Sequence, residues 1–208
     1  EETEQGIGSK VDQRRMRELR GNADIVLTGA GTLRASGTSS RLGNSGPEQI
    51  RVARGKPRAP TAAVISRSGD LPLDRPFFTA RDFDAVVYLS DEAPAARRQA
   101  IEATGRPVHM LPVLGPLDAM LKHMRHDLGS SVVLVEGGPS LNAGLFGLDV
   151  IDEYFVTIGP VVVGGWDTPT PVGGAKAFAR NELRRFDLVW ATANDETGEL
   201  YCRYRARR

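Results

Sequence analysis

One segment of this 208-residue sequence could bind a pyrophosphate group. The apolar run Val132–Val135 is followed by Glu136, Gly137 and Gly138, and Pro139 stands where the first residue of a helix is expected. Glycine allows the main chain to approach a ligand closely, and the start of a helix offers free N–H groups at the positive end of its dipole. The pattern predicts a pyrophosphate site, and a tight strand-to-helix turn that binds nothing is the alternative.

The carboxylate of Glu136 is the candidate catalytic group. It ends a predicted buried strand, and the carboxyl ends of parallel strands open the crevice in which α/β proteins bind ligands. A carboxylate at this point could position a substrate or relay a proton. The alternative is a structural glutamate that caps the next helix or forms an ion pair.

Two further turns follow predicted strands and carry phosphate-binding residue types. In the first, Gly29 and Gly31 form Gly-x-Gly, but Arg34 stands where the dinucleotide fingerprint has its third glycine. In the second, Ser66-Arg67-Ser68-Gly69 combines two hydroxyls with a guanidinium, which suits a phosphate monoester such as the 2′-phosphate of NADP. Ordinary turn chemistry is the alternative for each.

Composition argues against several other classes of protein. Lys plus Arg is 27 and Asp plus Glu is 26, so no large positive charge points to nucleic acid. The histidines His109, His123 and His126 have no metal-site spacing. Cys202 is the single cysteine, which excludes an internal disulfide and fits a reducing cytoplasm. No apolar run approaches the roughly 20 residues that span a bilayer. We expect a cytoplasmic protein without a metal.

The elements that must position these residues alternate between strands and helices. Short runs rich in Val, Ile and Leu without polar alternation are typical of parallel strands covered on both faces. Ser90-Asp91 is suited to cap a helix. The predicted strands are Asp24–Thr28, Thr61–Ser66, Asp84–Leu89, Pro107–Leu111 and Ser131–Glu136, and the predicted helices are Val11–Arg20, Glu92–Thr104, one from Pro116 to about Leu128 and one from Pro139 to Gly147.

The last third of the chain has a different pattern. Tyr154–Pro160 is a predicted strand, and Leu183–Thr192 and Glu199–Arg205 are predicted to pair as an antiparallel hairpin. Two stretches rich in Gly, Pro, Ser and Thr, Ala35–Pro60 and Gly164–Ala179, receive no element. Long loops of this kind are often functional, and part of the second, from Gly164 to Gly174 with Pro169 and Pro171 inside, could be a lid or a dimer contact. We expect one α/β domain over residues 1–208.

Taken in order, these motifs resemble the reductase domain at the C-terminus of the bifunctional riboflavin-pathway deaminase–reductase. The resemblance runs from about Ser9 to Arg205. It implies a dihydrofolate-reductase-like, three-layer α/β fold with a mostly parallel central sheet. The motifs are Leu19-Arg20-x-x-Ala23-Asp24, Gly29-x-Gly31-Thr32-Leu33-Arg34, Val135-Glu136-Gly137-Gly138-Pro139-Ser140-Leu141, Val150-Ile151-Asp152-Glu153-Tyr154, Ile158-Gly159-Pro160 and Val163-Gly164-Gly165.

The resemblance implies NADPH as cofactor and a homodimer as the assembly. It places Glu136 at a position that faces the substrate, and Arg14 beside the sugar phosphate. The implied cofactor residues are Gly29, Gly31 and Thr32 against the cofactor, Ser66 and Arg67 near the 2′-phosphate, and Gly137, Gly138, Ser140 and Leu141 around the pyrophosphate.

This sequence departs from the family pattern in two places. The family has an Asp-Asn/Asp-Pro segment beside the substrate, where this chain has Ser36, Gly37 and Thr38; Ser36 is therefore the candidate substrate contact. The family's first strand also carries a Ser-Leu-Asp-Gly segment before the first helix, and we expect that strand and the deaminase domain to be missing from this chain.

The leading hypothesis is an NADPH-dependent reductase acting on a substrate like 5-amino-6-(5-phosphoribosylamino)uracil. The alternatives are a reductase of pterins such as dihydrofolate, which the missing aspartate favours, and a dinucleotide-binding protein without catalysis.

Overall fold

The computed structural model describes residues 8–37, 40–43, 46–166, 168, 170–174 and 177–208. The chain divides into two compact units. The parallel unit is Arg15–Gly138, and the antiparallel unit combines Glu1–Arg14 with Pro139–Arg208. One boundary falls inside helix α1 (Lys10–Asn22), and the other directly precedes helix α7 (Pro139–Gly147). The single domain expected from the sequence stays a prediction.

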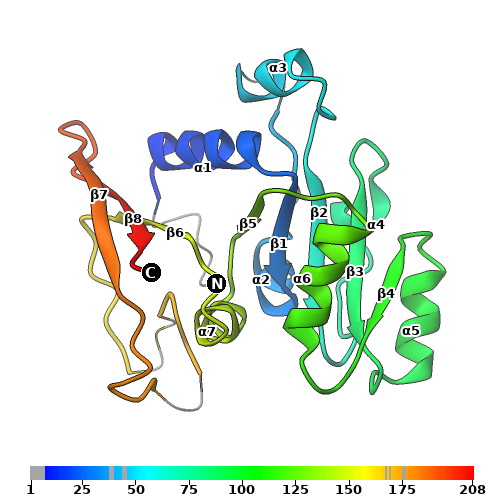
Figure 1. Cartoon of the computed structure of the whole chain (residues 1–208). Coiled ribbons are helices and arrows are strands. Elements are labelled where there is room, and N and C mark those ends of the chain that lie inside the picture. The colour runs from blue at the N-terminus through cyan, green and yellow to red at the C-terminus, as the bar shows by residue number, and fades with distance from the viewer. Residues whose placement is uncertain (1–7, 38–39, 44–45, 167, 169, 175–176) are drawn as a thin grey trace. The chain divides into compact units, whose positions relative to one another are not determined.

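The parallel unit contains a five-stranded sheet in the order β4-β3-β2-β1-β5 (Figure 1). All four strand pairs are parallel, which confirms the class predicted from the apolar runs. From β1 the chain adds β2, β3 and β4 on one side and then returns to place β5 on the other side. The strand order therefore reverses between β1 and β5. The strands are β1 (Ile25–Gly29), β2 (Thr61–Ser66), β3 (Ala85–Ser90), β4 (Val108–Leu111) and β5 (Val133–Val135).

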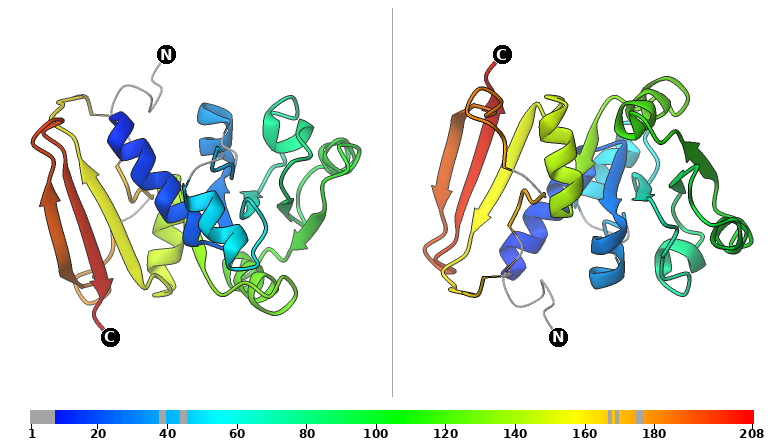
Figure 2. Two further views of the ribbon diagram at one scale, coloured as in Figure 1. Left: turned by 90° about the horizontal axis from the view of Figure 1, so that it is seen from above. Right: turned by 90° about the horizontal axis from the view of Figure 1, so that it is seen from below.

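Helices cover both faces of this sheet. Figures 1 and 2 show α2 and α4 on one face and α6 on the other. Beneath α2 and α4 lies a fully apolar core in which the rings of Phe77 and Phe78 meet edge to face at 4.9 Å. The helices that lie wholly in this unit are α2 (Ala30–Ser36), α3 (Gly46–Ala53), α4 (Pro76–Thr79), α5 (Ala95–Glu102) and α6 (Pro116–His126).

Several local predictions were wrong in the parallel unit. The residues after Gly29 are not a glycine turn but the start of α2, so Gly31 lies inside a helix. Helix α3 lies within a stretch left without an element, and α4 was not predicted. Helix α5 begins at Ala95 rather than Glu92, and Ser90 does not cap it. Pro94 is the residue before that helix, and a proline disfavours helical geometry in the residue that precedes it.

The antiparallel unit contains a three-stranded sheet in the order β6-β8-β7. Its strands are β6 (Glu153–Ile158), β7 (Phe186–Ala193) and β8 (Leu200–Ala206). The pairing of β7 with β8 confirms the predicted hairpin. An aromatic cluster of Phe146, Tyr154 and Phe186 joins α7 to this sheet. In the described part of 164–179 the chain forms neither helix nor strand.

A buried carboxylate organises one end of this antiparallel sheet. Glu199 is 2% exposed and accepts hydrogen bonds from the main chain and hydroxyl of Ser9 and from the hydroxyls of Thr197 and Tyr201. These donors stabilise the charged form, and they lower the pKa of Glu199 to about 2 against the opposing effect of burial. The β7–β8 hairpin is thereby tied to Ser9, whose hydroxyl also accepts from the first turn of α1.

Candidate functional site

Two glycine segments meet where the strand order of the parallel sheet reverses. The N–H of Gly29, at the end of β1, donates to the carbonyl of Gly137 across a 2.7 Å N···O distance. One step earlier, the N–H of Glu136 donates to the carbonyl of Leu27 at 2.9 Å. In open α/β sheets this reversal point, at the carboxyl edge, is where a ligand crevice forms. The structure thus brings two of the three predicted phosphate-binding segments together.

The glycines leave this edge without side chains. Gly137 has φ of 88°, a conformation that side-chain-bearing residues rarely adopt, and its peptide bond to Gly138 is cis. A Cβ on Gly138 would lie 3.1 Å from the hydroxyl oxygen of Thr32, so the bare main chain and Thr32 already face each other closely. On Gly31 a Cβ would meet only Arg34, at 4.0 Å. The two segments thus lie side by side with little side-chain bulk between them, and the binding of a diphosphate here stays a prediction.

The third predicted segment lies on the adjacent strand. Ser66 ends β2, which pairs with β1, and its side chain is buried. The hydroxyl oxygen of Ser66 accepts the N–H of Gly69 at 3.0 Å, which holds the turn in place. Arg67 is exposed at the tip of that turn. The exposed guanidinium of Arg67 can donate to an anion at this edge, whereas the hydroxyl of Ser66 is buried in the turn.

A neighbouring charge cluster was not predicted from the sequence. Arg34 donates to the carbonyl oxygen of Asp70 at 2.7 Å, and Arg97 donates to the carboxylate of Asp70 at 2.6 Å. Arg34, which replaces the third glycine of the fingerprint, therefore joins α2 to the turn after β2. Its spacing along the helix gave no signal for this contact, because Asp70 lies far away in sequence.

The carboxylate of Glu136 forms an ion pair with Arg20 of α1. Arg20 Nε lies 2.5 Å from Oε1 and Nη2 lies 2.7 Å from Oε2, so the pair is bidentate. Burial alone would lower the pKa of Arg20, but the hydrogen bond and charge of Glu136 outweigh it, and the pKa of the guanidinium is raised. Of the structural alternatives for Glu136, the structure contains the ion pair and not the helix cap. Its role toward a substrate stays a prediction.

The remaining predicted site residues differ in exposure. Ser36 is exposed at the end of α2, and its hydroxyl donates to the carbonyl of Thr32 at 2.9 Å. Gly37 ends that helix with φ of 60°, and Thr38 lies outside the described residues. Arg14 is exposed on α1, within the antiparallel unit.

Ser140 and Leu141 form the first turn of α7, also in the antiparallel unit. Ser140 is exposed, whereas the side chain of Leu141 is buried, so only the main chain of Leu141 is suited to contact a phosphate. The N–H of Gly173 donates to the carbonyl of Pro139 at 3.1 Å, and Asn142 donates to that of Pro171. Part of the proposed lid thus lies against this turn, while Pro169 is outside the described residues.

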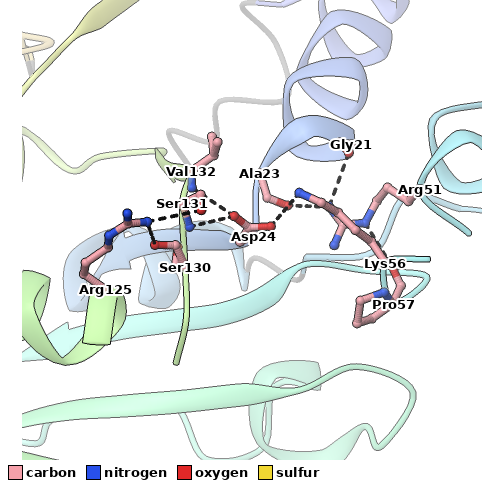
Figure 3. Close-up of polar contacts among 10 residues, drawn as sticks. All are labelled: Gly21, Ala23, Asp24, Arg51, Lys56, Pro57, Arg125, Ser130, Ser131 and Val132. Carbon is pink, nitrogen blue, oxygen red and sulfur yellow. Dashed lines mark hydrogen bonds and ion pairs between the residues drawn. The ribbon is translucent and has the colours of Figure 1, made fainter. Parts of the chain in front are cut away.

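At the opposite, amino edge of the sheet, Asp24 fixes the register of β1 against β5 (Figure 3). Its carboxylate accepts the N–H groups of Ser131 and Val132, each at 2.9 Å, and pairs with Lys56 at 2.7 Å. Burial raises the pKa of Asp24, but these three donors outweigh it and the net shift is downward.

Arg51 supports the same edge from α3 (Figure 3). It is 2% exposed, and its guanidinium donates to the carbonyl groups of Gly21, Ala23 and Pro57. Together Asp24 and Arg51 hold the end of α1 and the start of β1 in a fixed position.

The histidines have packing contacts. The rings of His109 and His123 lie 3.8 Å apart, and the hydroxyl of Tyr88 lies 2.9 Å from Nδ1 of His123. Across the described ranges, no three His, Cys, Asp or Glu side chains are grouped so that they could hold a metal ion. Within the same ranges no helix is both long and apolar enough to cross a membrane.

Comparison with protein families gives one match to nearly the whole chain. A family model described as the RibD C-terminal domain matches residues 1–194. Among curated proteins, the chain is 28% identical over 160 residues to the 2,5-diamino-6-ribosylamino-4(3H)-pyrimidinone 5′-phosphate reductase of Aquifex aeolicus, covering 76% of this chain and 66% of that protein.

The chain also resembles a chloroplastic riboflavin biosynthesis protein of Arabidopsis thaliana, with 27% identity over 168 residues. That match covers 80% of this chain but 26% of the plant protein, so the chain spans about a quarter of its length. Among solved structures, a pyrimidine reductase-like protein of Corynebacterium diphtheriae superposes with a TM-score of 0.87 and 22% identity, over 99% of this chain and 85% of that one. This likeness shows the fold and confirms the dihydrofolate-reductase-like class expected from the motifs.

Proposed function

Because this chain belongs to the RibD C-terminal domain family, we propose that it is an NADPH-dependent reductase of a phosphorylated ribosylaminopyrimidine, as in riboflavin biosynthesis. The observation that carries the proposal is the cradle made by Gly29 and Gly137 at the strand-order reversal, with the Ser66–Gly69 turn on the adjacent strand. Such an edge suits a dinucleotide that carries phosphate groups at two positions, with its pyrophosphate at the glycines and its 2′-phosphate at the turn.

The residues present fit NADPH. Gly29, Gly31, Gly137 and Gly138 have no side chains of their own, and the hydroxyl of Thr32 lies close to Gly138, so a pyrophosphate would meet main chain and one hydroxyl at this edge. Arg67 is exposed beside it and can bind the 2′-phosphate that NADH lacks. As the resemblance implies, the main chain of Ser140 and Leu141 would add N–H donors at the start of α7.

The substrate is proposed from the donor and acceptor groups near this edge. Glu136 offers acceptor oxygens for the amino and ring N–H groups of an aminopyrimidine. Arg14 would bind the sugar phosphate and Ser36 would contact the substrate, as the resemblance implies. The named relative from Aquifex acts on a diaminopyrimidinone, so both that compound and 5-amino-6-(5-phosphoribosylamino)uracil are candidate substrates.

The residues of this chain have an orienting role in the reaction. NADPH, when bound, would supply the hydride. Gly29, Gly31, Gly137 and Gly138 would hold the cofactor and Glu136 would orient the pyrimidine, so that the two reactants would be held in position for the transfer. The protein thereby lowers the entropic part of the barrier, and the redox chemistry belongs to the cofactor. We expect a homodimer in the cytoplasm, and light scattering on the purified chain tests the dimer.

A single assay separates the candidate functions. The purified chain is incubated with NADPH and, in turn, each of the two pyrimidine phosphates and dihydrofolate, while cofactor oxidation and cofactor binding are both followed. Turnover with a pyrimidine supports the proposal. Turnover with dihydrofolate alone identifies a pterin reductase, and NADPH binding without any turnover identifies a binding protein. Absence of NADPH binding contradicts all three.

A further inference from the structure

The ion pair between Arg20 and Glu136 is the most enclosed bidentate pair beside the proposed site. The Glu136 side chain is 6% exposed and that of Arg20 is 20% exposed. By contrast, the exposed pair of Arg98 and Glu102 on α5 has exposures of 49% and 43%. A pair removed from water is costly to disturb, because loss of one partner leaves a buried charge without compensation. Arg20 therefore restricts the conformation of Glu136 far more than a surface partner would.

Main-chain hydrogen bonds anchor the segments that carry both partners. The main-chain N–H of Glu136 is bonded to Leu27 of β1, which fixes its Cα in the sheet. Arg20 belongs to the last turns of α1, and the carbonyl of the following Gly21 accepts from the buried Arg51. The chain then enters β1 through Asp24, which is bonded to the start of β5. The guanidinium and the carboxylate thus approach each other from two anchored main-chain segments.

The bidentate geometry uses one lone pair of each carboxylate oxygen. Each oxygen of Glu136 already accepts one N–H from Arg20, at Oε1 and Oε2 respectively. A carboxylate oxygen has two lone pairs, so each keeps one further acceptor position. Both oxygens accept N–H groups of Arg20 in this geometry, so the pair presents them as acceptors. This matches the N–H groups of an aminopyrimidine.

We propose that Arg20 is a positioning residue that holds the Glu136 carboxylate as a fixed acceptor for the N–H groups of the pyrimidine substrate. The inference rests on the proposed function. It assigns Glu136 to substrate recognition, so the proton that accompanies hydride transfer comes from another group or from water. It also assigns a role to Arg20 of the motif Leu19-Arg20-x-x-Ala23-Asp24.

The test is a double-mutant cycle with kinetic and binding readouts. The variants are Arg20→Met, Glu136→Gln and the double variant, with Arg20→Lys as the conservative change. Arg98→Met, which breaks the exposed pair on α5, is the matched control. For each variant the measurements are kcat and KM for the pyrimidine, the NADPH dissociation constant and the melting temperature.

We expect Arg20→Met to lower kcat/KM for the pyrimidine by about 10- to 100-fold, mostly through KM, because the acceptor is misplaced. NADPH affinity should stay at the wild-type value. In the Glu136→Gln background the same change should alter kcat/KM by no more than about twofold, since Arg20 acts through Glu136. Arg20→Lys should give an intermediate kcat/KM, because lysine keeps the positive charge but cannot form the bidentate pair. Arg98→Met should have wild-type kinetics.

Chemical rescue adds a readout that a purely structural pair would not move. Arg20→Ala leaves space for a guanidinium, so millimolar guanidinium should restore part of kcat/KM, whereas urea, which is neutral and of similar shape, should not. Wild-type kinetics in Arg20→Met with only a lower melting temperature would overturn the inference, as would additive effects in the cycle. If Arg20→Met does not fold, Arg20→Lys decides: wild-type kcat/KM at an unchanged melting temperature overturns it.

Failure of the proposed function is recognised separately. If the wild-type chain oxidises no NADPH with either pyrimidine, the proposed function is wrong and the inference falls with it. If the wild type turns over and the Arg20 variants do so equally well, only the positioning role is wrong.

Discussion

The main-chain N–H of Gly29 donates a 2.7 Å hydrogen bond to the carbonyl oxygen of Gly137. This bond joins the ends of β1 and β5 at the point where the order of the parallel strands reverses. Because both residues are glycines, neither adds a side chain at this edge. The proposed cofactor site extends from this bond toward Ser66, at the end of the next strand, and Arg67 directly after it.

Arg67→Ala should weaken the binding of NADPH but not that of NADH. We expect the loss of NADPH binding to be about 1.5–3 kcal/mol, the range for hydrogen bonds to charged groups, with NADH binding unchanged. Arg54→Ala, which removes another exposed arginine of the parallel unit, is the control and should alter neither. Calorimetric titration with both cofactors gives the measurement, and equal losses for NADPH and NADH would contradict the 2′-phosphate assignment.

Gly31→Ala should weaken the cofactor complex without weakening the fold. A Cβ at this helical position has only Arg34 within reach, at 4.0 Å, and alanine in place of a helical glycine stabilises by about 1 kcal/mol. If NADPH lies against Gly31, the added methyl group should lower its affinity while the melting temperature is kept or raised. The matched control is Gly46→Ala, at the open start of α3. Undiminished affinity would remove Gly31 from the proposed site.

Asp24→Ala tests the amino-edge contact of Figure 3. The carboxylate of Asp24 joins β1, β5 and Lys56, so its loss should lower the free energy of unfolding by about 1–2 kcal/mol. Asp82→Ala, which removes an exposed partner of Arg41, should leave the denaturant midpoint unchanged, because exposed pairs contribute little. A similar midpoint for both variants would show that Asp24 does not hold the strands together.

Glu199 makes a pH-dependent contribution to stability. Its pKa in the folded state is about 2, below the ordinary value of 4.5. The folded state therefore gains stability from the charged form above pH 4.5, and this gain is lost as the pH falls toward 2. Glu199→Gln should melt at a lower temperature than the wild type at neutral pH, and the two should converge in acid. A constant difference across that range would contradict the network around Glu199.

Much of the fold could be predicted because its signals are local. Each central strand is a continuous apolar run, and Thr61–Ser66 matches β2 residue for residue. Pro139 and Gly147 bound α7 as predicted. The short helix α2 was taken for a turn because Gly29 and Gly31 suggested one, whereas burial of Leu33 against the sheet favours the helix. Tertiary packing outweighs the low helix propensity of glycine there.

The site was predicted in outline and its ion pairs were not. Glycine turns after strands are visible in sequence, and parallel topology brings strand ends together. No local pattern could show that Glu136 meets Arg20, or that Asp24 meets Lys56 and Ser131, since these partners come from distant segments. Such contacts exist only once the folded chain has brought these segments together. Ion pairs between distant segments therefore mark the limit of what the sequence could reveal.

We propose that the carboxyl edge of the parallel sheet binds NADPH. The amide resonances of the ¹⁵N-labelled chain, followed during an NADPH titration, test this. We predict that the amides of Gly29, Gly31, Gly137 and Gly138 shift together and saturate with one dissociation constant, while those of Ser131 and Val132 at the amino edge stay in place. Shifts confined to the amino edge, or none at saturating NADPH, would contradict it.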